Sequence, residues 1–236
     1  MTPARSLSIV VPAFNEAANI AGTLDNVTGA LSTLSITHEI LVVDDGSRDA
    51  TGEIVAAYAQ RFPAVRLVTN DRNRGFGWTY RRGVELAALD YIVMVHGDNA
   101  WGADTLRSLF QRVGDADLVI GYTRNMWRSR SWTRTAISKT FTLFVNLITG
   151  RRLRYYNGLQ IHPAAVLKTM SIESTGFGFQ AEVLAKSLRQ TRTFIEVPMD
   201  LIERAHGESK AFRLANVVDV ARTLGRLCAR EWSLSK

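Results

Sequence analysis

The chain has almost no cysteine and no long uninterrupted apolar run. Of its 236 residues only Cys228 is a cysteine, so no disulfide can form within the chain, which fits a reducing compartment. No stretch reaches the roughly 18 uncharged apolar residues of a transmembrane helix. The best candidate, residues 140–149, is about half that length. Residues 1–6 are too few and too polar for a signal peptide, so we expect a cytoplasmic protein.

Acidic residues are missing from residues 118–172, although the chain contains 22 of them. This acid-free segment supplies more positive charge than the whole-chain excess of +7. An ordinary solvated surface is one explanation, but the complete absence of acids favours an anionic partner. No nucleic-acid-binding motif accompanies the charge, so nucleic acid is not expected. The basic residues of the segment are Arg124, Arg128, Arg130, Arg134, Lys139, Arg151, Arg152, Arg154 and Lys168.

Several common catalytic and binding motifs are also missing. There is no P-loop, no CxxC pair and no Ser/His/Asp triad. The first expected strand is followed by Pro-Ala-Phe-Asn-Glu, without the glycines of a dinucleotide-binding turn. Gly75, Gly77 and Gly83 instead indicate a close backbone approach or a helix start.

Strands and helices alternate along the first half of the chain. The strands are almost continuously apolar, which predicts an α/β fold with a mostly parallel central sheet flanked by helices. The length fits one domain, residues 1–236. We expect strands at 7–11, 39–43, 65–69, 91–95, 118–120 and 193–197, and a short element around 158–162. We expect helices at 17–31, 51–61, 79–88, 103–113, 131–148, 164–170, 180–189 and 212–232.

Polar residues follow three of these strands, at 12–16, 44–47 and 96–98. In parallel sheets ligands bind beyond the carboxyl ends of the strands, so we expect the three segments to converge. Asp45 is the expected ligand for a base N–H or a ribose hydroxyl. For Asp44 and Asp49 we expect only capping and bracing of the loop.

Two further groups of residues suit a metal-bound diphosphate. Asp98 offers the oxygen ligands that hard cations prefer, and His96 makes Mn²⁺ at least as suitable as Mg²⁺. The alternative leaves Asp98 as the only protein ligand, with His96 in a supporting role. Arg204 and Lys210 lie on a glycine-containing loop after the strand–proline segment 194–198, where they suit a lid over a diphosphate.

Together these residues resemble family 2 glycosyltransferases of the GT-A fold, most closely the dolichyl-phosphate mannose synthase-like branch. The resemblance covers about 7–214. It rests on the motifs at 11–16, 43–47, 73–83, 96–99 and 207–210. It implies a nucleotide-binding half, 1–121, and an acceptor- and membrane-facing half, 122–236.

The resemblance also implies roles for individual residues. Nucleoside contacts would come from Pro12, Phe14, Glu16, Val43 and Asp45. Gly97 and Asp98 would lie at the phosphates and the metal, and Arg204 and Lys210 would bind the diphosphate. Arg124 resembles the family arginine near the donor and acceptor phosphates. Two departures stand out: His96 replaces the first metal aspartate, and Trp78 stands where a small residue is common.

The implied activity is inverting transfer of a hexose from a GDP- or UDP-sugar to a polyprenyl phosphate. Because such an acceptor is already anionic near neutral pH, a strong base is unnecessary. A neutral glycan or small-molecule hydroxyl is the main alternative, and it would need a carboxylate base, for which Glu182 is the nearest candidate. A non-catalytic nucleotide- or carbohydrate-binding protein is the second alternative.

Aromatic residues interleave with the arginines of the acid-free segment. Trp127, Trp132, Phe141 and Phe144 are expected on an interfacial amphipathic helix that docks on an anionic membrane surface. This predicts a peripheral protein on the cytoplasmic face of a membrane. The sequence leaves open whether an integral membrane partner anchors it.

Overall fold

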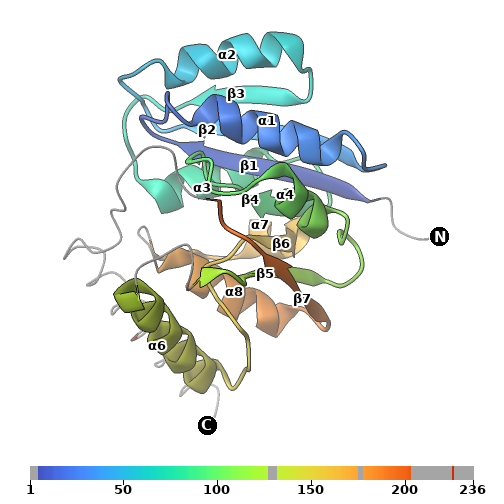
Figure 1. Cartoon of the computed structure of the whole chain (residues 1–236), viewed down its shortest axis with the longest axis vertical. Helices are drawn as coiled ribbons and strands as arrows, with labels where there is room; N and C mark the ends of the chain where they lie inside the picture. The colour runs from blue at the N-terminus through green and yellow to red at the C-terminus, as the bar shows by residue number, and fades with distance from the viewer. Residues whose placement is uncertain (1–4, 127–131, 175–177, 203–224, 226–236) are drawn as a thin grey trace.

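The computed structural model describes residues 5–126, 132–174, 178–202 and 225. These form one seven-stranded sheet with helices on both faces (Figure 1). The strands are β1 (Ser6–Ala13), β2 (Thr37–Asp44), β3 (Val65–Thr69), β4 (Tyr91–Met94), β5 (Leu118–Thr123), β6 (Gln160–Pro163) and β7 (Phe194–Met199). The helices are α1 (Ile20–Leu31), α2 (Thr51–Arg61), α3 (Phe76–Leu86), α4 (Ala103–Phe110), α6 (Trp132–Thr149), α7 (Ala164–Thr169) and α8 (Phe179–Gln190).

The strand order is β3-β2-β1-β4-β6-β5-β7. All neighbours are parallel except β6, which is antiparallel to both β4 and β5. The predicted mostly parallel α/β fold is therefore confirmed. Connections run outward in opposite directions from β1 and β4, so a ligand site is expected beyond the carboxyl ends of these strands.

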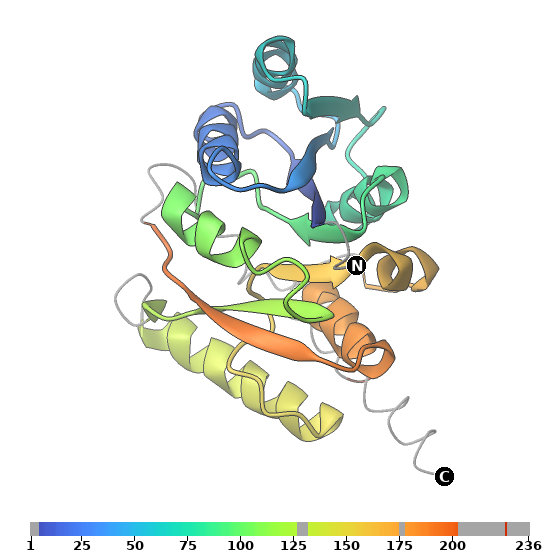
Figure 2. The same cartoon turned by 90° about the vertical axis from the view of Figure 1, so that its right-hand side faces the viewer.

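Both faces of the sheet are covered, which explains why its central strands are continuously apolar. Helices α1, α2 and α4 cover one face, and α3, α7 and α8 cover the other (Figure 2). Ile9 belongs to the core on the first face and Val10 to the core on the second, and neither is exposed. Helix α6 lies beyond the β5–β7 end of the sheet and packs on β5 and α8 through Val145.

Two of the element boundaries that differ from expectation have a clear local cause. Strand β1 continues through Pro12 instead of ending before it. The strand tolerates this proline, which has no backbone N–H, because β1 pairs with β4 only as far as Val10. No bond between β1 and β4 is therefore lost at Pro12. Helix α3 begins at Phe76 rather than near Thr79. Gly75 precedes it with a φ of 91°, a conformation that favours glycine and turns the chain into the helix.

The expected helix at 212–232 lies outside the described residues apart from residue 225. Among the residues that the structure describes, no helix has the length and apolar character needed to cross a bilayer.

Candidate functional site

The loops after β1 and β2 are tied together by hydrogen bonds. The backbone N–H of Asn15 donates to Ser47 Oγ (2.9 Å), and the N–H of Arg48 donates to Asn15 Oδ1 (2.9 Å). The N–H of Glu16 donates to Thr51 Oγ1 (2.8 Å). Asn15 has a φ of 54°, a left-handed conformation that asparagine tolerates better than most residues. The two loops therefore form one preorganised unit at the carboxyl edge of the sheet.

Asp44 and Asp49 brace this unit, as predicted. Asp44 Oδ1 accepts from the N–H of Ser47 (3.0 Å), and Asp49 accepts from the N–H groups of Ala17 and Thr51 (both 3.1 Å). Burial of Asp49 opposes ionisation, but its hydrogen bonds, led by that from the Thr51 hydroxyl, outweigh burial and lower its pKa. Asp49 is thereby kept ionised as a loop brace.

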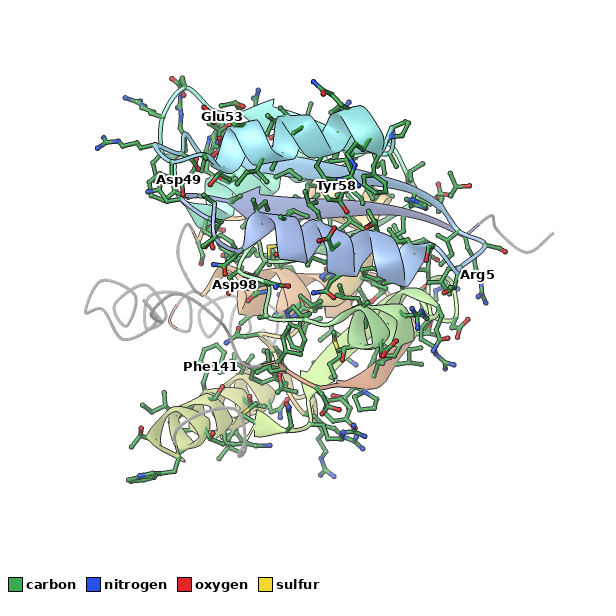
Figure 3. All side chains as sticks on the ribbon, turned by 45° about the horizontal axis from the view of Figure 1, so that its top comes forward. Arg5, Asp49, Glu53, Tyr58, Asp98 and Phe141 are labelled. Atoms are coloured by element: carbon green, nitrogen blue, oxygen red, sulfur yellow. The ribbon has the colours of Figure 1, made fainter. Side chains whose placement is uncertain are left out.

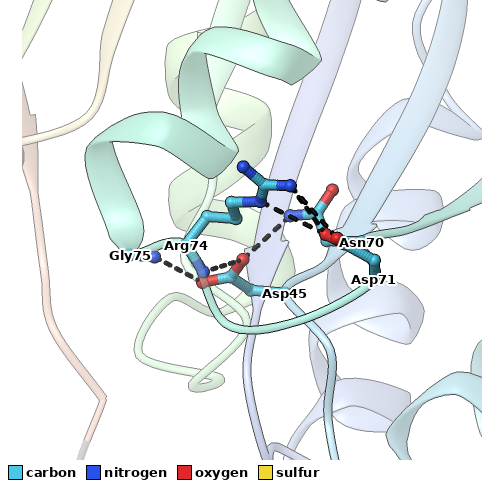
Figure 4. Close-up of polar contacts among 5 residues, drawn as sticks. All are labelled: Asp45, Asn70, Asp71, Arg74 and Gly75. Atoms are coloured by element: carbon cyan, nitrogen blue, oxygen red, sulfur yellow. Dashed lines mark hydrogen bonds and ion pairs between the residues drawn. The ribbon is translucent and has the colours of Figure 1, made fainter.

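Asp45 is more strongly engaged than the sequence suggested. Its buried carboxylate accepts from Asn70 Nδ2 (2.8 Å) and from the backbone N–H groups of Arg74 (2.9 Å) and Gly75 (2.8 Å), as Figure 4 shows. A carboxylate has about four acceptor positions, so these three bonds leave room for one further donor. Asp45 thus joins the end of β2 to the start of α3, and its role as a nucleoside ligand stays a prediction.

The other residues expected at the nucleoside lie around this unit. Pro12 and Val43 are buried in the sheet, and Val43 is fully enclosed in the core beneath the site. Phe14 and Glu16 are half-buried in the loop beyond β1. Glu16 Oε2 accepts from Asn19 Nδ2 (2.8 Å), which holds this carboxylate at the start of α1.

The loop after β4 carries the expected metal residues. Thr23 of α1 fixes the loop, because its hydroxyl donates to Gly97 O and accepts from the N–H of Asn99, both at 3.0 Å. An added Cβ at Gly97 would lie 3.2 Å from Pro12 O, so only glycine fits easily against β1 here. Figure 3 shows Asp98 at the same end of the strands as Asp49, with Arg5 at the other end.

His96 and Asp98 can contribute to a metal site but cannot complete one. Asp98 is half-buried, and its Oδ1 is shielded from solvent. The His96 ring stacks on Phe76, with centroids 5.1 Å apart. No group of three or more His, Cys, Asp or Glu side chains among the described residues could hold an ion. This donor set fits an ion that takes its remaining ligands from substrate phosphates and water.

Arg124 lies just beyond β5, at the same edge. Its guanidinium forms a two-pronged ion pair with Asp200, which follows β7. The hydrogen bond to Arg124 lowers the pKa of Asp200, and the same bond raises that of Arg124. Asp200 was not anticipated from the sequence, because the ion pair joins residues 76 positions apart.

Glu182 is held inside the protein. Its carboxylate accepts from Lys186 Nζ (2.5 Å) and from the backbone N–H groups of Glu173 (3.0 Å) and Ser174 (2.8 Å). Burial alone would raise its pKa, but these hydrogen bonds, led by that from Lys186, outweigh burial and lower it. A carboxylate held in this way is a weak base, so the geometry does not favour Glu182 as a general base. Lys186 lies one helical turn after Glu182, and this i,i+4 spacing is the signal in the sequence from which the pairing could have been predicted.

Arg204 and Lys210 lie outside the described residues, as does Trp127. On α6, Trp132 and Phe144 are exposed as expected, at 73% and 54%. Phe141 is not part of this surface, because it packs against the core between α6 and α8. The sequence reading missed three exposed apolar residues on the same face of α6: Ile137, Leu143 and Leu147.

The model of the family "Glycosyl transferase family 2" matches residues 8–176. The undecaprenyl-phosphate mannosyltransferase of Micrococcus luteus is 30% identical over 85% of this chain and 85% of its own. The undecaprenyl-phosphate 4-deoxy-4-formamido-L-arabinose transferase of Aeromonas hydrophila is 30% identical over 89% of this chain. The dolichyl-phosphate beta-glucosyltransferase of Dictyostelium discoideum is 26% identical over 77% of it. The matches span only 64% and 62% of these last two proteins.

Among solved structures, glucosyl-3-phosphoglycerate synthase from Mycobacterium tuberculosis is similar. Its complex with Mn²⁺, UDP and glucosyl-3-phosphoglycerate superposes with a TM-score of 0.74 at 20% identity, covering 95% of this chain and 80% of that one. A further structure of the same protein contains Mg²⁺ and UDP. At this identity the likeness concerns the fold.

Proposed function

The chain belongs to glycosyl transferase family 2, and we propose that it is an inverting enzyme that moves a hexose from a nucleotide sugar to a polyprenyl phosphate. Its fold is the GT-A type that the sequence resemblance implied. The names of the relatives support the choice of acceptor, because all three include a polyprenyl phosphate.

The observation that carries this proposal is the meeting of three loops at one edge of the sheet. The loops after β1 and β2 share hydrogen bonds, and Thr23 of α1 ties the loop after β4 to the same unit. A nucleoside over the first two loops would direct its diphosphate toward Asp98, as expected where strand order reverses.

A divalent ion, Mn²⁺ or Mg²⁺, fits between the donor phosphates and Asp98, with His96 beside it. Such an ion would neutralise the leaving nucleoside diphosphate. Arg124, Arg204 and Lys210 are proposed to add positive charge at the phosphates. For Arg124 this requires the donor to share or replace its contact with Asp200.

An acceptor that is already anionic needs no general base, which agrees with the finding that the carboxylate of Glu182 is a weak base. A phosphate oxygen can attack the anomeric carbon without losing a proton first, whereas a hydroxyl needs a base. Glu182, the nearest candidate, is engaged with Lys186 and two backbone N–H groups. The basic residues of the acid-free segment would attract the same anionic acceptor.

We further propose that the protein docks on the cytoplasmic face of an anionic membrane through α6. Three of the most exposed apolar side chains of α6 are Trp132, Leu143 and Leu147, at 73%, 60% and 71%. Arg151 and Arg152 follow the helix and are exposed. An apolar face next to basic residues is the pattern of interfacial helices.

Transfer assays with matched acceptors test the proposed reaction. Purified protein would be incubated with UDP- and GDP-hexoses, Mn²⁺ or Mg²⁺, and either a short polyprenyl phosphate or the corresponding unphosphorylated alcohol. We expect sugar transfer to the phosphate only, and loss of transfer in Asp98→Asn. Equal transfer to the alcohol would favour a hydroxyl acceptor. Binding of nucleotide without turnover of any donor would favour a non-catalytic binding protein.

A further inference from the structure

Three residues of α1 contact the loop that joins β4 to α4 and carries Asp98. They are Gly22, Thr23 and Asn26, and we call them the α1 clamp. They lie on one side of the helix, since residues three and four positions apart are neighbours there. Asp98 lies beside the first turns of α1 (Figure 3). The contacts of the clamp fall before and after Asp98 in the chain, so they hold this residue from both directions.

Thr23 holds the two peptide groups that join Asp98 to its neighbours. Its hydroxyl donates to Gly97 O, in the peptide group before Asp98, at 3.0 Å. It accepts from the N–H of Asn99, in the peptide group after Asp98, also at 3.0 Å. Thr23 is buried, so one enclosed hydroxyl fixes the backbone on both sides of the carboxylate.

Asn26 holds the next part of the loop. Its Nδ2 donates to Asn99 Oδ1 (2.8 Å), and its Oδ1 accepts from the N–H of Ala103 (3.1 Å), the first residue of α4. Gly102, which precedes α4, has no side chain to cap the helix, so Asn26 supplies the acceptor instead. Asn99 has a φ of 53°, a left-handed conformation that asparagine tolerates. Its bond to Asn26 stabilises this turn of the chain.

Gly22 leaves room for the side chain of Asn99. A Cβ at Gly22 would lie 2.5 Å from Asn99 Nδ2 and 3.2 Å from Asn99 Cγ. The Asn99 side chain could give way only by straining its bond to Asn26. Glycine is unfavourable in a helix interior compared with alanine. The close approach of the loop is the reason for a glycine at this point of α1.

The same helix begins in the loops expected to bind the nucleoside. The N–H groups of Asn19 and Ile20 donate to Glu16 O (2.9 and 2.8 Å), and the N–H of Glu16 donates to Thr51 Oγ1. Helix α1 therefore connects the unit formed by the loops after β1 and β2 to the loop that carries Asp98. Since the proposed donor has to reach from one to the other, α1 fixes the distance that it must span.

We propose that Gly22, Thr23 and Asn26 are positioning residues, which hold Asp98 where it can bind the ion of the donor diphosphate. The inference rests on the proposed function, since it concerns the metal of the same donor. None of the three has to touch the ion. Residues that only orient a metal ligand commonly change metal affinity tenfold to a hundredfold when they are altered, roughly the effect expected here.

Titration of the full chain with Mn²⁺ tests this assignment without turnover. Electron paramagnetic resonance of the free ion measures binding, with UDP or GDP at a concentration that saturates each variant. We expect Gly22→Ala, Thr23→Val and Asn26→Ala each to weaken Mn²⁺ binding about tenfold. Thr23→Ser keeps the hydroxyl, so it should restore most of the affinity lost in Thr23→Val.

Gly29→Ala is the matched control, because it makes the same substitution in the same helix. A Cβ at Gly29 would lie 3.7 Å from Ala103 Cβ, an ordinary contact. It should leave Mn²⁺ binding unchanged. Both alanine substitutions favour the helix itself, so urea denaturation should show that Gly22→Ala is folded. Should Thr23→Val unfold, the comparison of Gly22→Ala with Gly29→Ala decides the question.

The possible outcomes separate the two proposals. A wild-type protein that binds no Mn²⁺ with either nucleotide contradicts the metal of the proposed function, and the clamp with it. Wild-type Mn²⁺ affinity in Gly22→Ala and Thr23→Val overturns the clamp alone. Equal losses in Gly22→Ala and Gly29→Ala would show a general effect on the helix, which also overturns the clamp.

Discussion

Asp45, which directly follows β2, accepts a 2.8 Å hydrogen bond from the backbone N–H of Gly75, which directly precedes α3. The same carboxylate also binds the N–H of Arg74 and the amide of Asn70. One buried side chain thereby connects the loops that follow β2 and β3. A donor bound at Asp45 would meet a carboxylate whose position is already fixed.

Asp45→Asn should weaken both the fold and nucleotide binding. An asparagine offers one acceptor oxygen and no charge, so backbone N–H groups now bonded to Asp45 lose a partner. We expect a loss of about 1–3 kcal/mol in the free energy of unfolding, measured by urea denaturation. Nucleotide affinity, measured by calorimetry, should fall about tenfold. Asp71→Asn is the control, because Asp71 is exposed and forms a surface ion pair with Arg74; its effect should stay within about 1 kcal/mol.

Metal dependence should follow His96 and Asp98 in the loop after β4. Asp98→Asn should reduce donor turnover about 100-fold or more, because the ion loses its carboxylate ligand. His96→Asp should shift the preference from Mn²⁺ toward Mg²⁺, since a carboxylate replaces imidazole. Initial rates over a titration of each ion measure both effects. If His96→Asp leaves the ratio of the two rates unchanged, His96 is not a ligand.

The exposed face of α6 should control membrane binding without affecting stability. Leu143→Glu with Leu147→Glu should abolish sedimentation with anionic vesicles, because two exposed leucines become charged. Stability should change by no more than about 0.5 kcal/mol. A control with the same added charge is Ala56→Glu with Gln60→Glu on the exposed face of α2. Equal recovery of wild-type protein on neutral and anionic vesicles at low salt would contradict the role of the basic residues.

Stability should fall in mild acid because of His162. Its folded pKa of about 3 lies below the unfolded value of about 6.5, so the unfolded state binds the proton more readily. The free energy of unfolding should be fully retained above about pH 6.5 and lost by about 1.4 kcal/mol per unit as the pH falls toward 3. His162→Gln should reduce this slope, as measured by urea denaturation at pH 7, 6 and 5. An unchanged slope in His162→Gln would show that another group is responsible.

The sequence predicted the layered α/β fold because strand and helix periodicity are local signals. It missed the antiparallel pairing of β6, since a four-residue strand carries little pattern of its own. It assigned Phe141 to the exposed face of α6 and overlooked Leu143 and Leu147, because the face that packs depends on where α8 lies. The ion pair of Arg124 with Asp200 likewise joins residues 76 positions apart, so no local pattern could predict it.

The loops beyond β1 and β2 are held largely by backbone N–H groups bonded to Ser47, Thr51 and Asp49. Few side chains there can vary without loosening the whole unit. Substitutions that evolution accepts at this edge of the sheet would therefore fall mainly on side chains that take no part in these bonds.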